Sequence, residues 1–64
     1  GVLSMFTVLV YMLQDDTLVL VRRIPHVISV EFKDGAFFVT VFTSDDGPDI
    51  IPVDSSYYLA CCRV

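Results

Sequence analysis

The chain has little of what most chemical sites require. Among 64 residues there are one histidine, two cysteines, three glycines and no tryptophan. Cys61 and Cys62 are adjacent, so they form neither a paired zinc-ligand motif nor the framework of a disulfide-stapled secreted domain. The glycines are scattered and make no loop that could cradle phosphate. We therefore expect no cofactor and no metal site.

Support for catalysis is equally scarce. His26 is the only side chain that we expect to titrate near neutral pH. No local signature, such as a nucleophile elbow, places a serine or a cysteine beside it. We expect His26 to be a structural or surface residue, and we expect the protein not to be an enzyme.

Positive charge and long apolar runs are also limited. Four basic residues stand against eight acidic ones, which gives a net charge of −4. A binder of the phosphate backbone needs clustered Lys and Arg, so we do not expect nucleic acid as a partner. The apolar run over residues 2–13 is shorter than the roughly 20 residues of a membrane span, and it lacks the basic start of a signal peptide. We expect no membrane association, a cytoplasmic location and reduced cysteines.

Apolar residues, in contrast, are abundant. They make up 55% of the chain, whereas a domain of this size buries only about 60% of the surface that its unfolded chain exposes. Surplus apolar surface usually marks a partner or a second copy of the same chain. We expect residues 1–64 to form one small domain that makes a homodimer or binds another protein.

The clearest structural signal is a β-hairpin between His26 and Thr43. Asp34-Gly35 lies between two β-rich runs, which predicts a two-residue type I′ turn that pairs Lys33 with Ala36. The further predicted pairs are Phe32–Phe37, Val30–Val39, Ile28–Val41 and His26–Thr43. Because side chains alternate along a strand, the apolar members share one face. The other face pairs Val27 with Phe42, Ser29 with Thr40 and Glu31 with Phe38.

Other segments predict further strands. Residues 3–13 are apolar on both faces, which favours a buried central strand, covered from both sides or sealed by a second subunit. Asp15-Asp16 predicts a two-residue turn into a strand over residues 17–24, with the pairs Tyr11–Leu20, Val10–Val21 and Val8–Arg23. Pro25 predicts a corner in the sheet. Pro52 predicts that residues 50–53 form an edge strand or a bulge. Asp54 is expected to cap one helical turn, which a last strand over residues 57–64 follows.

These elements predict an all-β fold. We expect an antiparallel meander of five to six strands that forms a small barrel or a sheet completed by dimerisation. The order of tight hairpin, short strand, single helical turn with tyrosine and closing strand resembles the layout of SH3-like barrels. The resemblance implies a small barrel that binds a peptide or another ligand, although the chain lacks an aromatic row of the kind that grips a polyproline helix.

The candidate binding residues lie in and near an acidic loop over residues 44–49. We expect Asp45, Asp46 and Asp49, with Phe38 and Phe42, to bind a partner; the acid spacing is not that of an EF-hand. Our first hypothesis is a small acidic protein-interaction module, an inhibitor or adaptor. By analogy of size and charge, it resembles phage-type inhibitors that compete with nucleic acid for a basic groove. The alternatives are an oligomerising subunit of a larger assembly and the SH3-like ligand-binding barrel.

Overall fold

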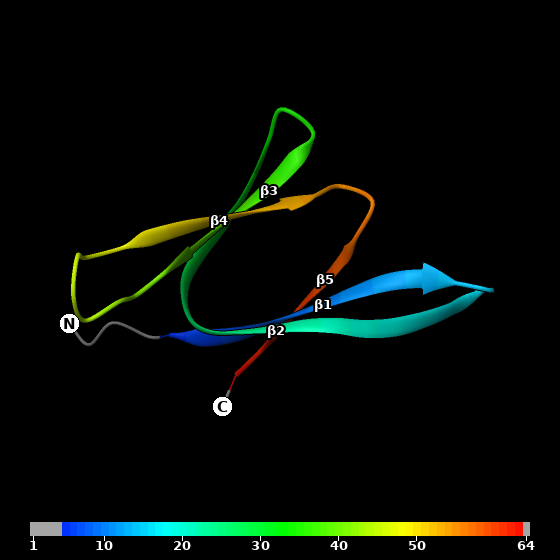
Figure 1. Ribbon diagram of the computed structural model, residues 1–64, viewed down its shortest axis with the longest axis horizontal. Coiled ribbons are helices and arrows are strands. Elements are labelled where there is room, and N and C mark those ends of the chain that lie inside the picture. Colours follow the sequence, from blue (N-terminus) through cyan, green and yellow to red (C-terminus); the bar gives the residue numbers. More distant parts are fainter. Residues whose placement is uncertain (1–4, 64) are drawn as a thin grey trace.

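The computed structural model describes residues 5–63, and all regular secondary structure among these residues is β-strand. The strands are β1 (Phe6–Gln14), β2 (Thr17–Lys33), β3 (Ala36–Val41), β4 (Asp49–Asp54) and β5 (Tyr58–Cys62). They form one antiparallel sheet in the order β4-β3-β2-β1-β5 (Figure 1). The predicted all-β antiparallel fold is confirmed. The sheet is open, because its edge strands β4 and β5 do not pair with each other.

The last strand departs from the predicted meander. β1 to β4 pair in chain order, but β5 returns to the far side of β1, with Tyr58 opposite Tyr11 and Cys62 opposite Thr7. The segment between β4 and β5 is a single turn without a helix, in which the Tyr57 N–H donates to the Asp54 carbonyl at 3.1 Å. This turn redirects the chain toward β1, whose apolar second edge would otherwise remain unpaired. The predicted placement of β1 inside the sheet is thereby confirmed.

β2 is one bent strand of 17 residues, where the sequence predicted two strands and a corner. Pro25 and His26 have no partners in the register, because Phe6 pairs with Val27 and Val8 with Ile24. His26 adopts a φ of 60°, in the left-handed region. Pro25 therefore sits in a bulge, where its missing N–H removes no ladder bond and the strand turns without ending. The corner is present, but it bends β2 instead of dividing it (Figure 1).

The central hairpin has the predicted turn and most of the predicted register. Asp34 and Gly35 adopt φ values of 53° and 78°, as a type I′ turn requires. The register holds from Lys33–Ala36 through Val30–Val39 to Ser29–Thr40. A bulge at Ile28 then shifts it, so Val41 pairs with Val27 and the predicted pairs Ile28–Val41 and Val27–Phe42 are wrong. The His26–Thr43 pair is also absent from the register; the His26 carbonyl accepts the N–H of Phe42 at 2.9 Å.

The β1–β2 hairpin shows the same combination of a correct turn and an unforeseen bulge. Asp15 and Asp16 adopt φ values of 52° and 61°, which confirms the two-residue turn, and Tyr11 pairs with Leu20 as predicted. One extra β2 residue, Val21, then shifts the ladder. The predicted pairs Val10–Val21 and Val8–Arg23 are wrong, and the observed pairs are Val10–Arg22, Leu9–Arg23 and Val8–Ile24.

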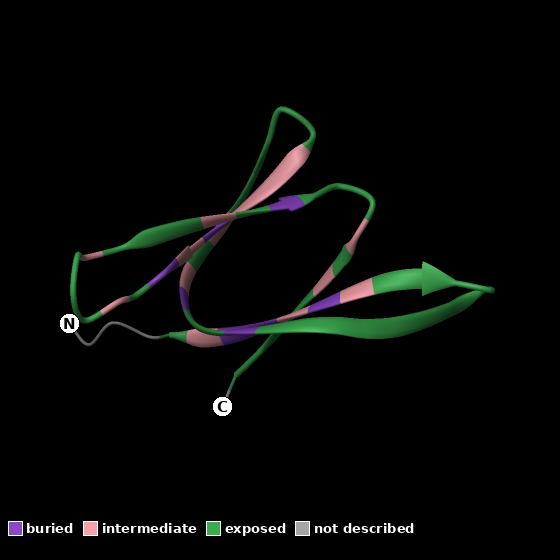
Figure 2. Ribbon diagram, in the orientation of Figure 1, coloured by how far each residue is buried: buried purple, intermediate pink, exposed green. Residues whose placement is uncertain are grey.

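A small core of β-branched side chains forms inside the bend of the sheet. Val8, Val27 and Val39 are fully buried, and each contributes about 1.5–3 kcal/mol relative to an exposed side chain. The other buried hydrophobic residues are Val10, Ile24, Val41 and Val53. Burial is concentrated in the middle of the molecule, and the far part of the β1–β2 hairpin is exposed (Figure 2). The core therefore covers only part of the apolar residues.

Candidate interaction surfaces

The β1–β2 hairpin carries an uncovered apolar surface on the side opposite the core. The cross-strand pairs Tyr11–Leu20 and Leu13–Leu18 lie on one face, and Tyr58 of β5 is the neighbour of Tyr11 on its other side. Leu13 and Leu18 are each 52% exposed, and Leu20 and Tyr58 are each 51% exposed. We call these five residues the outer apolar face.

Side-chain alternation explains why this face is separate from the core. Val8 and Val10 of β1 are buried on the inner side, so Leu9, Tyr11 and Leu13 lie on the outer side. In the described part of the chain Leu13, Leu18 and Leu20 remain about half exposed on this side, whereas Thr7, further along β1, is buried. The chain itself buries Val8 and Val10, as predicted for residues 3–13, but it does not cover Leu13. Residues 3 and 4 lie outside the described part of the chain.

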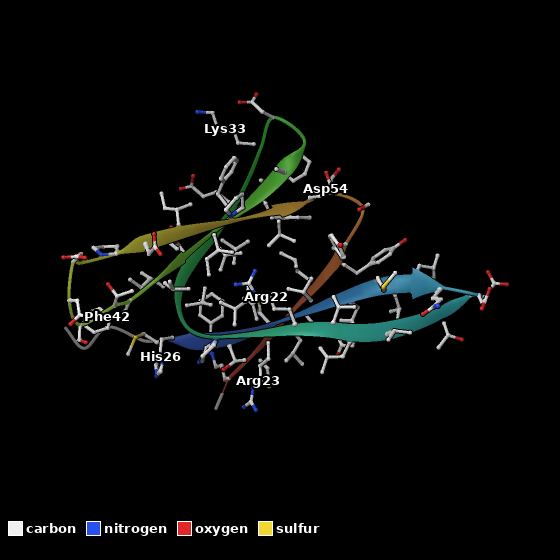
Figure 3. All side chains as sticks on the ribbon, viewed as in Figure 1. Arg22, Arg23, His26, Lys33, Phe42 and Asp54 are labelled. Atoms are coloured by element: carbon white, nitrogen blue, oxygen red, sulfur yellow. The ribbon has the colours of Figure 1, made fainter. Side chains whose placement is uncertain are left out.

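Opposite charges border the outer apolar face at its two ends. Arg23 pairs with Leu9 and so shares the outer side, whereas Arg22 pairs with Val10 on the inner side. Figure 3 shows the two arginine side chains on opposite sides of the ribbon. At the other end, Asp15 and Asp16 form the exposed turn. The face thus runs from a cation, across two apolar pairs, to two carboxylates.

The acidic loop brings together three of the predicted binding residues. Asp45, Asp46 and Asp49 are exposed and line a surface hollow of about 290 Å³. The loop is closed by the Thr43 hydroxyl, which donates to the Gly47 carbonyl, while Asp49 Oδ1 accepts the N–H of Ile50 at 3.0 Å. Among residues 5–63, no three His, Cys, Asp or Glu side chains are grouped so that they could hold a metal ion.

The two predicted phenylalanines lie in different surroundings. Phe42 is 49% exposed and lines a hollow of about 500 Å³ with Asp45, His26 and Met5. Phe38 is half-buried in the middle of β3, between Glu31 on β2 and Pro52 on β4. The structure therefore joins Phe42 to the acidic loop and leaves Phe38 apart from it.

A third surface lies on the inner side, between β2 and the turn after β4. This cleft of about 300 Å³ is lined by Val10, Val21, Arg22, Pro52, Val53, Asp54 and Tyr57. The Asp54 carboxylate is already used by the turn, because its Oδ2 accepts the N–H of Ser56 at 3.0 Å. Hydrogen bonds from the Ser56 side chain and backbone lower the pKa of Asp54 below its ordinary value. Arg22 lines the same cleft from β2.

Sequence reasoning did not select the outer apolar face as a site. The available signal was the concentration of apolar residues on both sides of the Asp15-Asp16 turn, at the end of a hairpin. A hairpin end is the part of a sheet that other elements cover least, so an apolar one indicates a contact surface.

Comparison with protein-family models, with curated proteins and with solved structures finds no match for this chain. The described part of the chain contains no helix with the length and hydrophobicity that a membrane crossing requires. The three surfaces are therefore the observations from which a function can be argued.

Proposed function

We propose that the protein is a non-enzymatic interaction module that acts through its outer apolar face. The observation that carries this proposal is that Leu13, Leu18, Leu20 and Tyr58 are half exposed on one side of the sheet. Contiguous apolar patches on a protein surface usually serve an interface. In this proposal the partner covers the apolar side of the hairpin, and the strand pairing of the sheet stays as it is.

The energetics favour a contact of this kind. Fully burying a leucine is worth about 1.5–3 kcal/mol, so covering the exposed half of each leucine adds roughly 1 kcal/mol. Three leucines and a tyrosine then supply several kcal/mol, which must offset an association cost of about 4–15 kcal/mol. The apolar face alone therefore gives weak binding, and polar groups at its border must contribute to affinity and orientation.

The test compares two surface variants with the wild-type protein. In Leu13→Ser/Leu18→Ser/Leu20→Ser the face becomes polar while the core stays unchanged, and circular dichroism verifies the fold. Asp45→Lys/Asp46→Lys is the control at the distant loop. We expect the triple variant to associate with itself at least tenfold more weakly, as measured by analytical ultracentrifugation. It should also bind proteins captured from a source-cell lysate at least tenfold more weakly. The control should be unaffected in both measurements. Equal association of all three proteins would overturn the proposal.

The acidic loop supports a second candidate function, inhibition of a protein with a basic groove. Asp45, Asp46 and Asp49 line one hollow, and Asp45 also lines the hollow of the half-exposed Phe42. Clustered carboxylates can compete with phosphates for Lys and Arg. Under this function Asp45→Lys/Asp46→Lys abolishes capture of the target, salt weakens the capture, and the triple serine variant retains it. A peptide-binding SH3-like barrel has less support, because the sheet is open.

A further inference from the structure

We infer that the occupant of the outer apolar face is a second copy of this chain, stacked face to face about a two-fold axis. The inference rests on the proposed function and names its partner. It follows from the order of charges along the face, where Arg23 lies at one end and Asp15 and Asp16 lie at the other.

The positions along the hairpin locate the axis. On the outer side, the cross-strand levels follow one another as Leu9–Arg23, Tyr11–Leu20, Leu13–Leu18 and the Asp15-Asp16 turn. Alternate residues of a strand are spaced about 6–7 Å apart, so these levels succeed one another at nearly equal steps. The midpoint between Arg23 and the turn lies between the two apolar pairs.

A two-fold axis at this midpoint makes the face complementary to itself. It places the Tyr11–Leu20 pair of one copy over the Leu13–Leu18 pair of the other. It also places Arg23 of each copy beside the Asp15-Asp16 turn of the other, which forms two equivalent charge contacts. Such self-complementarity is what an isologous interface requires, and opposite charges at the border fix its orientation.

The rest of the molecule is compatible with this arrangement. The acidic loop and the Asp15-Asp16 turn lie at opposite ends of the long axis (Figure 1), and the molecule extends over 42 Å in that direction. Antiparallel stacking of the two hairpins therefore moves the acidic loops to the two distal ends of the dimer. The net charge of −4 then opposes association little, because charges separated by more than about 10 Å are largely screened in 0.1 M salt.

The experiment is a charge exchange between copies, measured by sedimentation equilibrium and native mass spectrometry. In Arg23→Glu, the new glutamate of each copy faces the Asp15-Asp16 turn of the other, so both contacts become repulsive. In Asp15→Asn/Asp16→Lys, Arg23 of each copy faces the new lysine of the other, so both contacts are again repulsive. We expect the wild type to dimerise and each variant to dimerise at least tenfold more weakly. In an equimolar mixture all contacts become attractive, so we expect heterodimers with close to wild-type affinity. Arg22→Glu is the matched control, since Arg22 lies on the inner side, and it should dimerise normally.

Each outcome decides the inference. Monomeric wild type at millimolar concentration, variants that dimerise normally, or a mixture without heterodimers would each overturn it. Circular dichroism of the separate variants shows that weakened association does not arise from unfolding. If the wild type is monomeric but the triple serine variant loses a captured foreign protein, the self-association is wrong and the interaction module stands.

Discussion

Individual valines account for much of the core. Val39 is fully buried on β3, whereas Val19 on β2 is 37% exposed. Val39→Ala should lower the free energy of unfolding by about 2 kcal/mol, because it removes buried methyl groups and leaves a cavity. Val19→Ala is the matched control and should change it by less than about 0.5 kcal/mol. Urea unfolding of both variants is the measurement, and equal losses would contradict the assignment of the core.

Asp54 gives the turn between β4 and β5 a dependence on pH. The Ser56 hydroxyl is the first cause of its lowered pKa, followed by the Ser56 backbone, while Ser55 acts only through its backbone. A lowered pKa means that the charged carboxylate stabilises the folded state. This contribution is present above the ordinary pKa of 3.8 and is lost as the pH falls through the folded value.

Two serine variants test this assignment. Ser56→Ala should raise the pKa of Asp54 toward its ordinary value, because the side-chain hydrogen bond is removed. Ser55→Ala should leave the pKa lowered, since its backbone N–H remains. An NMR titration of the Asp54 carboxyl carbon measures both, and the assignment is wrong if the two variants give the same pKa.

At the scale of elements, a proline protects the edge strand β4 from pairing with other chains. Pro52 in the middle of β4 offers no N–H to an incoming strand. Pro52→Thr restores this donor, so we expect higher-order assembly in concentrated samples, detected by thioflavin T fluorescence and light scattering. Thr40→Val, on the neighbouring interior strand β3, is a control with similar β propensity and should not assemble. Absence of assembly in Pro52→Thr would show that Pro52 does not prevent β4 from pairing with strands of other chains.

The turns were predictable from the sequence because short local rules determine them. Asp34-Gly35 and Asp15-Asp16 fix the first pairs of their hairpins, and the register is correct next to both turns. The errors begin at Val21, the Pro25-His26 bulge and Ile28, where β2 contains extra residues. A bulge is set by how the whole sheet bends around its core, so hydrophobic alternation alone does not reveal it.

The pairing of β5 with β1 was outside the reach of local rules for a similar reason. A turn at Asp54 shows that the chain changes direction, but it does not show which strand edge is free to receive the next strand. Local rules also could not locate the outer apolar face. Surplus apolar surface was predicted from composition, yet its position depends on how the described strands bend around the core and leave the end of the β1–β2 hairpin exposed. The acidic loop was visible in the sequence because all its members are consecutive or nearly so.

At the scale of the whole molecule, the two proposed contact surfaces lie far apart and should act independently. On concentrating labelled protein, we expect amide NMR shifts to change in residues 9–23 and at Tyr58, and not in residues 43–49. The reason is that the two copies of the proposed dimer meet only along the outer side of the hairpin. Asp45→Lys/Asp46→Lys should give the same pattern, since distant sites contribute additively. Concentration-dependent shifts in the acidic loop would contradict the separation.

The return of β5 to β1 has a consequence for synthesis on the ribosome. β1 is made early and can pair at once with β2, but its second edge receives a strand only after residues 58–62 have left the exit tunnel. A nascent chain stopped before that point presents a row of free amides and carbonyls beside apolar side chains. Chaperones that hold extended apolar segments would find their target there, and pairing of β5 with β1 would remove it.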